Sequence, residues 1–253
     1  MPAIEACNVG LAVEADPEAI LEDVSLVVNE GEVVVIIGPS GCGKTSFLNM
    51  IAGLQGWTSG SILVRGETPR LGRPDSAYAL ARDALLPWRD AVGNVELALQ
   101  IRGVPKSDRR QLAMDALDRV GLTNAAGRHR AHLSQGMRQR VALARTFVTN
   151  PSLLILDEPF AALDALTRIA MQEVLLSLMQ RFSGTVVLVT HDLAEAITLA
   201  DRVVVFSPRP ATVIAEYEIT FPRPRDPALL RSDPYFAKIF DRIWKQIGQK
   251  AEL

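Results

Sequence analysis

Short apolar runs alternate along this chain with segments of helical periodicity. Residues 33–37 read VVVII and residues 153–157 read LLILD, and both runs have the length of a buried strand. Similar apolar runs predict strands at 61–66, 185–190 and 202–206. Between them, the spacing predicts helices at 45–52, 165–179 and 193–200. This order predicts an α/β fold, with a largely parallel sheet covered by helices.

A long helical stretch interrupts this alternation. From about residue 94 to residue 149, apolar residues recur at helical spacing, as in DRRQLAMDALDRV and RQRVALARTFV. We interpret it as a helical subdomain, about residues 85–150, inserted into an α/β domain that spans residues 1–227. Prolines 222, 224 and 227 mark a linker. The tail, 228–253, is predicted to form a helix over 228–249 that is broken or begins near Pro234.

Composition narrows the class of protein. Hydrophobic residues make up 48% of 253, which is enough for a sizeable core, and the net charge of −2 predicts no nucleic-acid partner. With only Cys7 and Cys42, a reducing compartment is expected. The N-terminus lacks the pattern of a secretory signal, and no apolar run approaches the roughly 20 residues of a membrane span. We therefore expect a chain that does not cross a bilayer but is able to dock on a protein that does.

The segment GPSGCGKTS matches the phosphate-loop pattern G-x-x-x-x-G-K-[ST] between a predicted strand and a predicted helix. Its glycines let backbone N–H groups converge on phosphate oxygens, and the helix N-terminus adds partial positive charge. Lys44 is expected to reach the β- and γ-phosphates of ATP, and the Thr45 hydroxyl to ligate Mg²⁺. The alternative is a glycine-rich turn without a ligand. The predicted ATP-binding residues are Gly38, Pro39, Ser40, Gly41, Cys42, Gly43, Lys44, Thr45 and Ser46.

Two acids and a histidine end predicted strands. Asp157 and Glu158 close the LLILD strand, where adjacent carboxylates are costly unless they face a cation or water. In a phosphate-loop protein the first acid, Asp157, holds Mg²⁺, and Glu158 is placed to act as general base. His191 follows the strand at 185–190, whose end opens at the same edge as the phosphate loop in a parallel sheet. His191 is thus a candidate for the γ-phosphate region; the alternative is a histidine that caps the next helix.

The stretch LSQGMRQRVALAR, residues 133–145, precedes the acidic strand, with Ser134 positioned to cap a helix. Together with the phosphate loop, it resembles the signature of ATP-binding cassette (ABC) ATPases. Four further stretches, ALLPW, DEPFAALDALTR, THDLAEAITLADRV and RPATVIAEYEITFPRPRD, resemble the nitrate, sulfonate and taurine import ATPases of that superfamily. The resemblance covers nearly the whole chain. It implies a P-loop NTPase fold: an ABC ATPase nucleotide-binding domain with an inserted helical subdomain.

The resemblance also implies a mechanism and partners. Two chains would pair head to tail as a homodimer, so that Ser134, Gln135 and Gly136 of one bind the γ-phosphate held by Lys44 of the other. Asp164, in the ALD segment, would couple the two chains. ATP binding and hydrolysis would drive transmembrane permease subunits, served indirectly by a periplasmic or extracellular solute-binding protein. The chain would lie at the cytoplasmic face of the inner membrane, as a peripheral subunit.

By the same resemblance, the Leu-Leu-Pro-Trp step lies near a groove that receives a short helix of the membrane subunit. Leu85, Leu86 and Trp88 are the candidate contacts. The alternative is that these side chains belong to the core, because Leu and Trp are usually buried. Both interpretations can hold, residue by residue.

The chain departs from the family pattern at two places. Ala81 stands where the family has a glutamine that contacts Mg²⁺ or the attacking water. Residues 1–46 contain no Phe, Tyr or Trp to stack on adenine, which leaves Val9, Leu11 or Val13 as an apolar shelf. Gln135 also replaces a usual glycine of the signature.

These departures keep open a nucleotide-responsive regulatory or binding subunit with low turnover, whereas the presence of Glu158 and His191 favours an ATPase. An ABC ATPase acting on nucleic acid or ribosomes would carry two cassettes or long insertions, and the sequence has neither. No residue identifies the transported solute, because the ATPase subunit does not touch it in this family.

Overall fold

The computed structural model describes residues 1–12, 18–80 and 83–251. The chain divides into two compact units. The first joins Met1–Arg73 to Gly184–Leu253, and the second is Pro74–Ser183. Each unit is described by itself. Among the helices that the structure describes, none combines the length and the apolar character needed to cross a bilayer.

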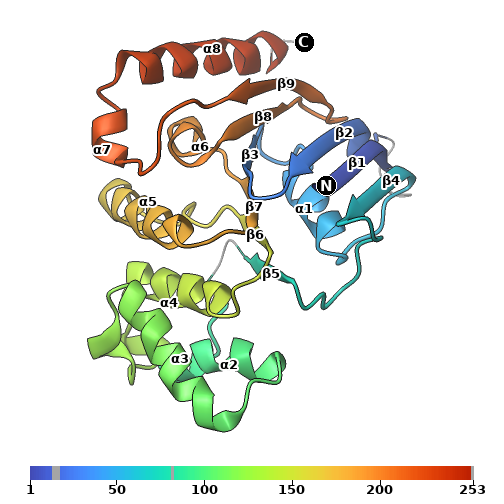
Figure 1. Cartoon of the computed structure of the whole chain (residues 1–253). Coiled ribbons are helices and arrows are strands. Elements are labelled where there is room, and N and C mark those ends of the chain that lie inside the picture. Colours follow the sequence, from blue (N-terminus) through green and yellow to red (C-terminus); the bar gives the residue numbers. More distant parts are fainter. Residues whose placement is uncertain (13–17, 81–82, 252–253) are drawn as a thin grey trace. The chain divides into compact units, whose positions relative to one another are not determined.

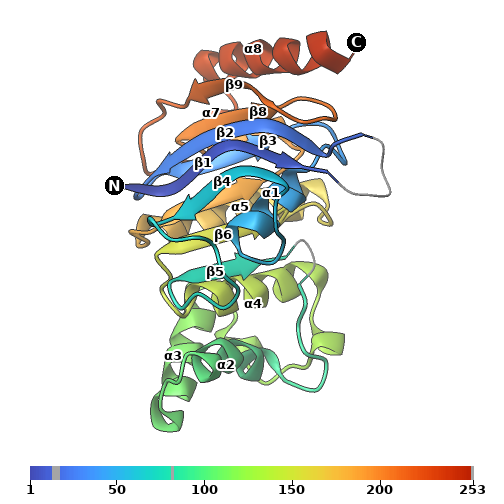
Figure 2. The ribbon, with the colours of Figure 1, turned by 90° about the vertical axis from the view of Figure 1, so that its right-hand side faces the viewer.

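The first unit contains an antiparallel sheet of three strands. Strands β1 (Pro2–Leu11), β2 (Leu21–Asn29) and β4 (Ser59–Val64) are ordered β2-β1-β4 and lie side by side in Figure 2. The expectation of a largely parallel sheet is wrong for this part of the chain. Polar residues and register shifts interrupt the apolar alternation of β1 and β2, and the pattern that identifies a strand is lost. Only β4 was expected, with bounds two residues later.

Parallel strands form the core of the same unit. Strands β7 (Thr185–Val189), β3 (Val33–Ile37) and β8 (Arg202–Phe206) are adjacent and parallel, and β9 (Val213–Glu218) adds an antiparallel edge. Every residue of β3 and β7 is buried, as their continuous apolar sequences predict. Helices α1 (Lys44–Ile51) and α6 (Leu193–Leu199) follow β3 and β7.

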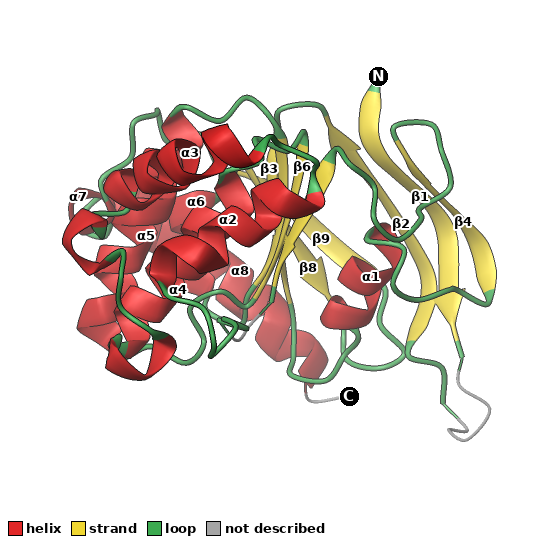
Figure 3. Cartoon of the chain, turned by 90° about the horizontal axis from the view of Figure 1, so that it is seen from below, coloured by secondary structure: helices red, strands yellow, loops and turns green. Residues whose placement is uncertain are grey.

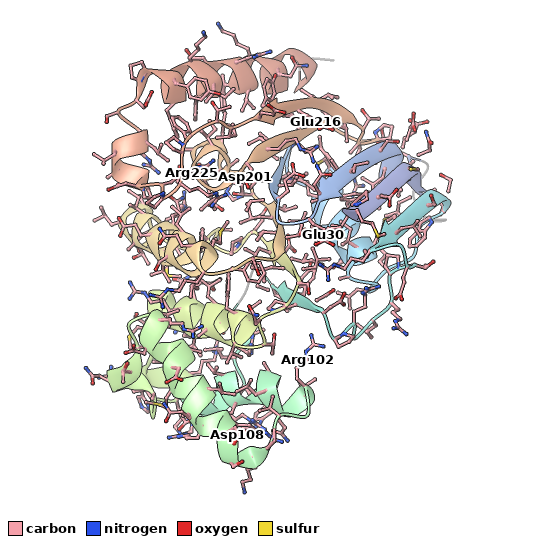
Figure 4. All side chains as sticks on the ribbon, in the orientation of Figure 1. Glu30, Arg102, Asp108, Asp201, Glu216 and Arg225 are labelled. Atoms are coloured by element: carbon pink, nitrogen blue, oxygen red, sulfur yellow. The ribbon has the colours of Figure 1, made fainter. Side chains whose placement is uncertain are left out.

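The C-terminal segment packs on the first unit. Helix α7 (Pro227–Leu230) is short, and α8 (Pro234–Ala251) begins at Pro234, as the sequence predicts. In Figure 1, α8 runs beside β9, and Phe236, Ile239 and Ile243 are its buried residues. The linker before it is anchored by Arg225, which lies close to Asp201 (Figure 4) and donates to the carbonyls of Ala200 and Phe221 at 2.5 and 3.1 Å.

The second unit pairs a short parallel strand, β5 (Ser76–Ala79), with β6 (Leu153–Asp157). Its helices, in red in Figure 3, are α2 (Ala91–Ile101), α3 (Lys106–Arg119), α4 (Gln135–Phe147) and α5 (Ala165–Gln180), with 3₁₀ turns at Thr123–Ala125 and Arg130–His132. The predicted helical subdomain, 85–150, lies inside this unit. The unit itself is larger, because α4 packs on both β5 and α5. The domain bounds inferred from sequence remain a prediction.

Candidate functional site

The phosphate loop joins β3 to α1 in the first unit. Gly41 and Gly43 have φ angles of +77° and +117°, a region that side chains other than glycine rarely adopt. A Cβ at Gly43 would lie 2.7 and 2.8 Å from side-chain atoms of Leu21 and Ile20, and one at Gly38 would lie 2.9 Å from the carbonyl oxygen of Phe206. The loop is therefore held closely by β2 and β8, and glycine is required at these positions.

Lys44 is almost completely buried in this loop, at 4% exposure, and donates to the carbonyls of Gly38 and Pro39 at 2.8 Å each. Gly43 precedes α1, and no described side chain caps that helix, so its first N–H groups face the loop. Burial raises the pKa of the Cys42 thiol, although the positive charges of Lys44 and Arg209 oppose this. Lys44 and these amide groups lie where the sequence predicts phosphate binding, and their role as an anion site stays a prediction.

Arg209 is a neighbour of the phosphate loop that sequence reasoning missed. Its Nε donates to the carbonyl of Gly41 at 2.8 Å, across 168 residues of sequence. A lone arginine in a Pro-rich turn carries no signal of such a contact.

His191 follows β7 in the same unit. Strands β3 and β7 pair in parallel from Val33–Val186 to Ile36–Val189, so Gly38 and His191 follow neighbouring strand ends. The side chain of His191 is exposed. The suggestion that His191 caps the next helix is wrong, because Asp192 does so by accepting from the Glu195 amide at 3.1 Å.

The two acids lie in the second unit. Asp157 ends β6 and is 7% exposed. Tyr78, on the neighbouring strand β5, donates a hydrogen bond to Asp157. The pKa of Tyr78 is raised, mainly because the side chain is buried and also because the negative Asp157 carboxylate accepts its proton in a hydrogen bond. Glu158 is half-buried with φ of +44°, a strained conformation for a glutamate. The sequence did not point to Tyr78, since only strand pairing brings it to Asp157.

The signature segment and the Asp164 segment contact each other within the second unit. Ser134 caps α4, as predicted, by accepting from the Met137 amide at 3.3 Å. Gln135 Nε2 donates to the Ala162 carbonyl at 2.5 Å. A Cβ at Gly136 would lie 2.9 Å from Thr167 Cγ2.

Asp164 caps α5 by accepting from the amide and the hydroxyl of Thr167, at 3.0 and 2.6 Å. These hydrogen bonds to Thr167 lower the pKa of the exposed Asp164 carboxyl. From sequence we interpreted the signature and the Asp164 segment as separate sites. In the structure they form one hydrogen-bonded cluster beside the N-terminus of α4.

A family model described as ABC transporter matches residues 21–161. The taurine import ATP-binding protein TauB of Escherichia coli O157:H7 is 39% identical over 237 residues, which cover 92% of this chain and 93% of that protein. TauB of Yersinia pestis biovar Antiqua (strain Antiqua) is 39% identical over 248 residues, covering 96% and 97%. The chain belongs to the ABC transporter family.

Solved structures agree with this assignment. A dimeric ATP-binding cassette in a post-hydrolysis state, bound to ADP and Pi, superposes with a TM-score of 0.75 at 30% identity, covering 86% of this chain and 99% of that one. A second dimeric structure, of a bacterial ABC transporter cassette, gives the same values. This ABC protein therefore has the fold of the ABC ATPase nucleotide-binding domain, binds ATP and hydrolyses it.

The Leu-Leu-Pro-Trp step of this ABC protein divides between core and surface. Leu85 is buried at 4% exposure, Leu86 is half-buried and Trp88 is 72% exposed. Buried Asn94 fixes the step, because it accepts from the Leu86 amide at 2.7 Å and donates to three backbone carbonyls of the turn. Leu85 therefore belongs to the core, as one of the two interpretations predicts. Trp88 lies at the surface, and its contact with a partner stays a prediction.

Just before this step, Asp83 binds arginines of the signature region. Its carboxylate accepts from Arg130 and Arg138 at 3.0 and 3.1 Å, and Arg138 also donates to the Leu133 carbonyl at 2.8 Å. Arg145 donates to the carbonyls of Asp83 and Ala84, both at 2.9 Å. This cluster ties the segment after residue 82 to α4. No sequence pattern predicts this cluster, because the three arginines lie 47 to 62 residues after Asp83 and Ala84.

Two predictions about departures from the ABC pattern have different outcomes. Val9 and Leu11 are buried, at 0% and 5% exposure, so they cannot form an exposed shelf for adenine. Val13 and Ala81 lie outside the described residues, and their roles stay predictions.

Proposed function

We propose that this ABC protein is the ATP-hydrolysing subunit of an importer for taurine, a sulfonate, nitrate or a related small solute. The support for import is the similarity to TauB over almost the full length of both chains. It works as a homodimer attached to transmembrane permease subunits, which a periplasmic or extracellular solute-binding protein supplies. Its place is the cytoplasmic face of the inner membrane.

In this proposal the loop from Gly38 to Ser46 binds the phosphates. Lys44 is already desolvated and held by two carbonyl oxygens, so it meets the β- and γ-phosphates with little rearrangement. Glu158 accepts a proton from the attacking water, and His191 approaches the γ-phosphate from the end of β7. The single observation that carries the proposal is this fixed, cationic loop at the end of a buried parallel strand.

Asp157 and Thr45 are the residues that would hold Mg²⁺. Their oxygen donors fit a hard cation that keeps most of its waters and binds through one or two protein ligands and the phosphates. The buried Asp157 carboxylate, with the Tyr78 hydroxyl as donor, has the chemistry of such a ligand. When bound, Mg²⁺ would neutralise charge on the phosphate oxygens.

The signature is proposed to act on the partner's ATP. Ser134 and Gln135 are exposed at the N-terminus of α4, where amide groups and the helix dipole favour an anion. The Gln135 side chain donates to the Ala162 carbonyl. It is therefore directed away from the N-terminal amide groups of α4, and this replacement of glycine does not block an anion from reaching them. Asp164, which caps the adjacent helix, would transmit closure between the two chains.

The test is Glu158→Gln. This variant removes the base and keeps the phosphate contacts, so turnover should fall at least about 100-fold while Mg-ATP traps a dimer. ATPase assays and size-exclusion chromatography with Mg-ATP measure the two effects. A variant that stays monomeric and hydrolyses ATP at the wild-type rate contradicts the role of Glu158.

Lys44→Ala is the companion variant. It should lose nucleotide affinity far more than it loses fold, because Lys44 sits on a loop and supplies charge to phosphates rather than core volume. Isothermal titration with a non-hydrolysable ATP analogue measures this. Unchanged affinity contradicts the phosphate-loop assignment.

A regulatory subunit with low turnover is the second candidate, favoured by Ala81 and by the absence of an aromatic residue in 1–46. A purified wild-type chain whose ATPase rate does not exceed that of Glu158→Gln would support it. The solute is tested separately, by solute-stimulated ATPase of the complete transporter across candidate anions. Stimulation by none of them contradicts the import assignment.

A further inference from the structure

The turn between β8 and β9 is a tightly bonded element of the first unit. The Ser207 amide donates to the Thr212 carbonyl at 3.0 Å, and the Thr212 amide donates back to Ser207 Oγ at 3.0 Å. Ser207 Oγ itself donates to the Pro208 carbonyl at 2.8 Å. The ends of the turn are thereby fixed, and the residues between them are presented in a defined direction.

The same turn is bonded to the start of β2. The Ala211 amide donates to the Ile20 carbonyl and the Glu22 amide donates to the Ala211 carbonyl, both at 3.0 Å. Ile20 and Leu21 are the residues that lie against Gly43 of the phosphate loop, and Phe206, at the end of β8, lies against Gly38. The turn and its neighbours therefore contact the loop near both of its ends.

Arg209 reaches the middle of the loop from this turn. Its Nε donates to the Gly41 carbonyl at 2.8 Å, and its side chain is exposed. Gly41 has φ of +77°, and a Cβ placed on it would meet nothing within 4 Å. The tip of the loop is thus an open, left-handed position. Arg209 holds its carbonyl, which orients the following amide groups.

From this geometry we propose that Arg209 is a positioning residue for nucleotide binding. It fixes the tip of the phosphate loop in its anion-binding conformation and adds a second positive charge beside Lys44. Because a guanidinium stays charged at any physiological pH, this contribution is permanent. The inference rests on the proposed role of the phosphate loop. It extends that role to a residue outside the loop motif.

The contact is better explained by binding than by folding. An exposed arginine has little apolar surface to bury, and hydrogen bonds at the surface contribute little to stability. A positive charge next to an anion site instead attracts every phosphate ligand, whether or not the ligand carries a nucleobase.

The test is Arg209→Ala, with affinity measured for Mg-ATP, for ADP and, by competition, for inorganic tripolyphosphate. We expect all three to weaken by a similar factor of about ten, equivalent to about 1.4 kcal/mol. The melting temperature should change by less than about 2 °C, as for an ordinary surface substitution. Removing a cation should also make affinity less dependent on salt concentration. Arg231→Ala, which removes another exposed arginine of the same unit, should leave all affinities unchanged.

Three results overturn the inference: wild-type affinity in Arg209→Ala, a loss for ATP without a loss for tripolyphosphate, and an equal loss in Arg231→Ala. The second would mean that Arg209 contacts the base. Failure of the inference is distinguishable from failure of the proposed function. If the wild type binds ATP, Lys44→Ala does not, and Arg209→Ala binds ATP with wild-type affinity, only the inference is wrong. If the wild type binds no nucleotide, the phosphate-loop role itself is wrong.

Discussion

At residue 81 the chain carries a methyl group where its resemblance to ABC ATPases leads us to expect a side-chain amide. If this position is the family's glutamine, Ala81→Gln should raise the ATPase rate several-fold, since about 1.4 kcal/mol of barrier corresponds to a tenfold rate. The melting temperature should stay nearly unchanged. Steady-state ATPase assays and thermal unfolding measure the two.

Ala81→Met is the matched control, because it adds similar volume without an amide and should not raise the rate. If Ala81→Gln is no faster than wild type, another group already orients the water, or the glutamine position lies elsewhere. Ala81 would then carry no information about turnover.

At the scale of elements, Asp83 joins the segment before the Leu-Leu-Pro-Trp step to the signature helix. Burial alone would raise the pKa of Asp83, but the hydrogen bonds from Arg130 and Leu85 and the charges of Arg130 and Arg138 lower it below its usual range. A carboxyl whose pKa is lower in the folded chain stabilises the fold above its unfolded pKa. That stability is lost as the pH falls through the folded pKa.

We therefore expect Asp83→Asn to melt at a lower temperature than wild type at pH 7, and the difference to shrink below about pH 4, near the unfolded pKa of aspartate. Thermal unfolding monitored by circular dichroism across pH measures this. Asp241→Asn, an exposed position on α8, is the control and should show no such difference. A constant difference across the whole pH range would mean that the charge of Asp83 does not matter.

At the scale of the whole molecule, the proposed contact with the membrane subunits can be tested at Trp88 of the second unit. Trp88 is 72% exposed on a turn that Asn94 fixes, so its side chain is presented without being part of the core. An exposed aromatic on a rigid turn suits an interface anchor. We expect Trp88→Glu to reduce co-purification of the permease subunits with the tagged ATPase by tenfold or more.

Trp244→Glu is the matched control, since Trp244 is 61% exposed on α8 of the first unit. It should co-purify with the permease like wild type. If the permease subunits co-purify with Trp88→Glu as they do with wild type, the turn does not contact them. The exposure of the Trp88 side chain then has another cause.

The sequence by itself determined the parts whose chemistry is local. The phosphate loop, the Ser134 cap and the strand-end acids could all be predicted, because glycine conformations, helix caps and buried strands depend on residues a few positions apart. The buried strands β3 and β7 also followed from two uninterrupted apolar runs, and their parallel direction followed from the alternation of strands with helices. Strands β1 and β2 did not, because register shifts and polar positions interrupt their pattern.

Only the tertiary structure decided which distant side chains support these motifs. Arg209 reaches Gly41 across 168 residues, and Asp83 reaches Arg138 across 55. The tertiary structure also decided the Leu-Leu-Pro-Trp step, because it places Leu85 in the core and Trp88 at the surface. No periodicity or spacing reports such contacts, because a hydrogen bond or a buried face depends on where the chain returns in space. That return is fixed by the packing of the complete unit.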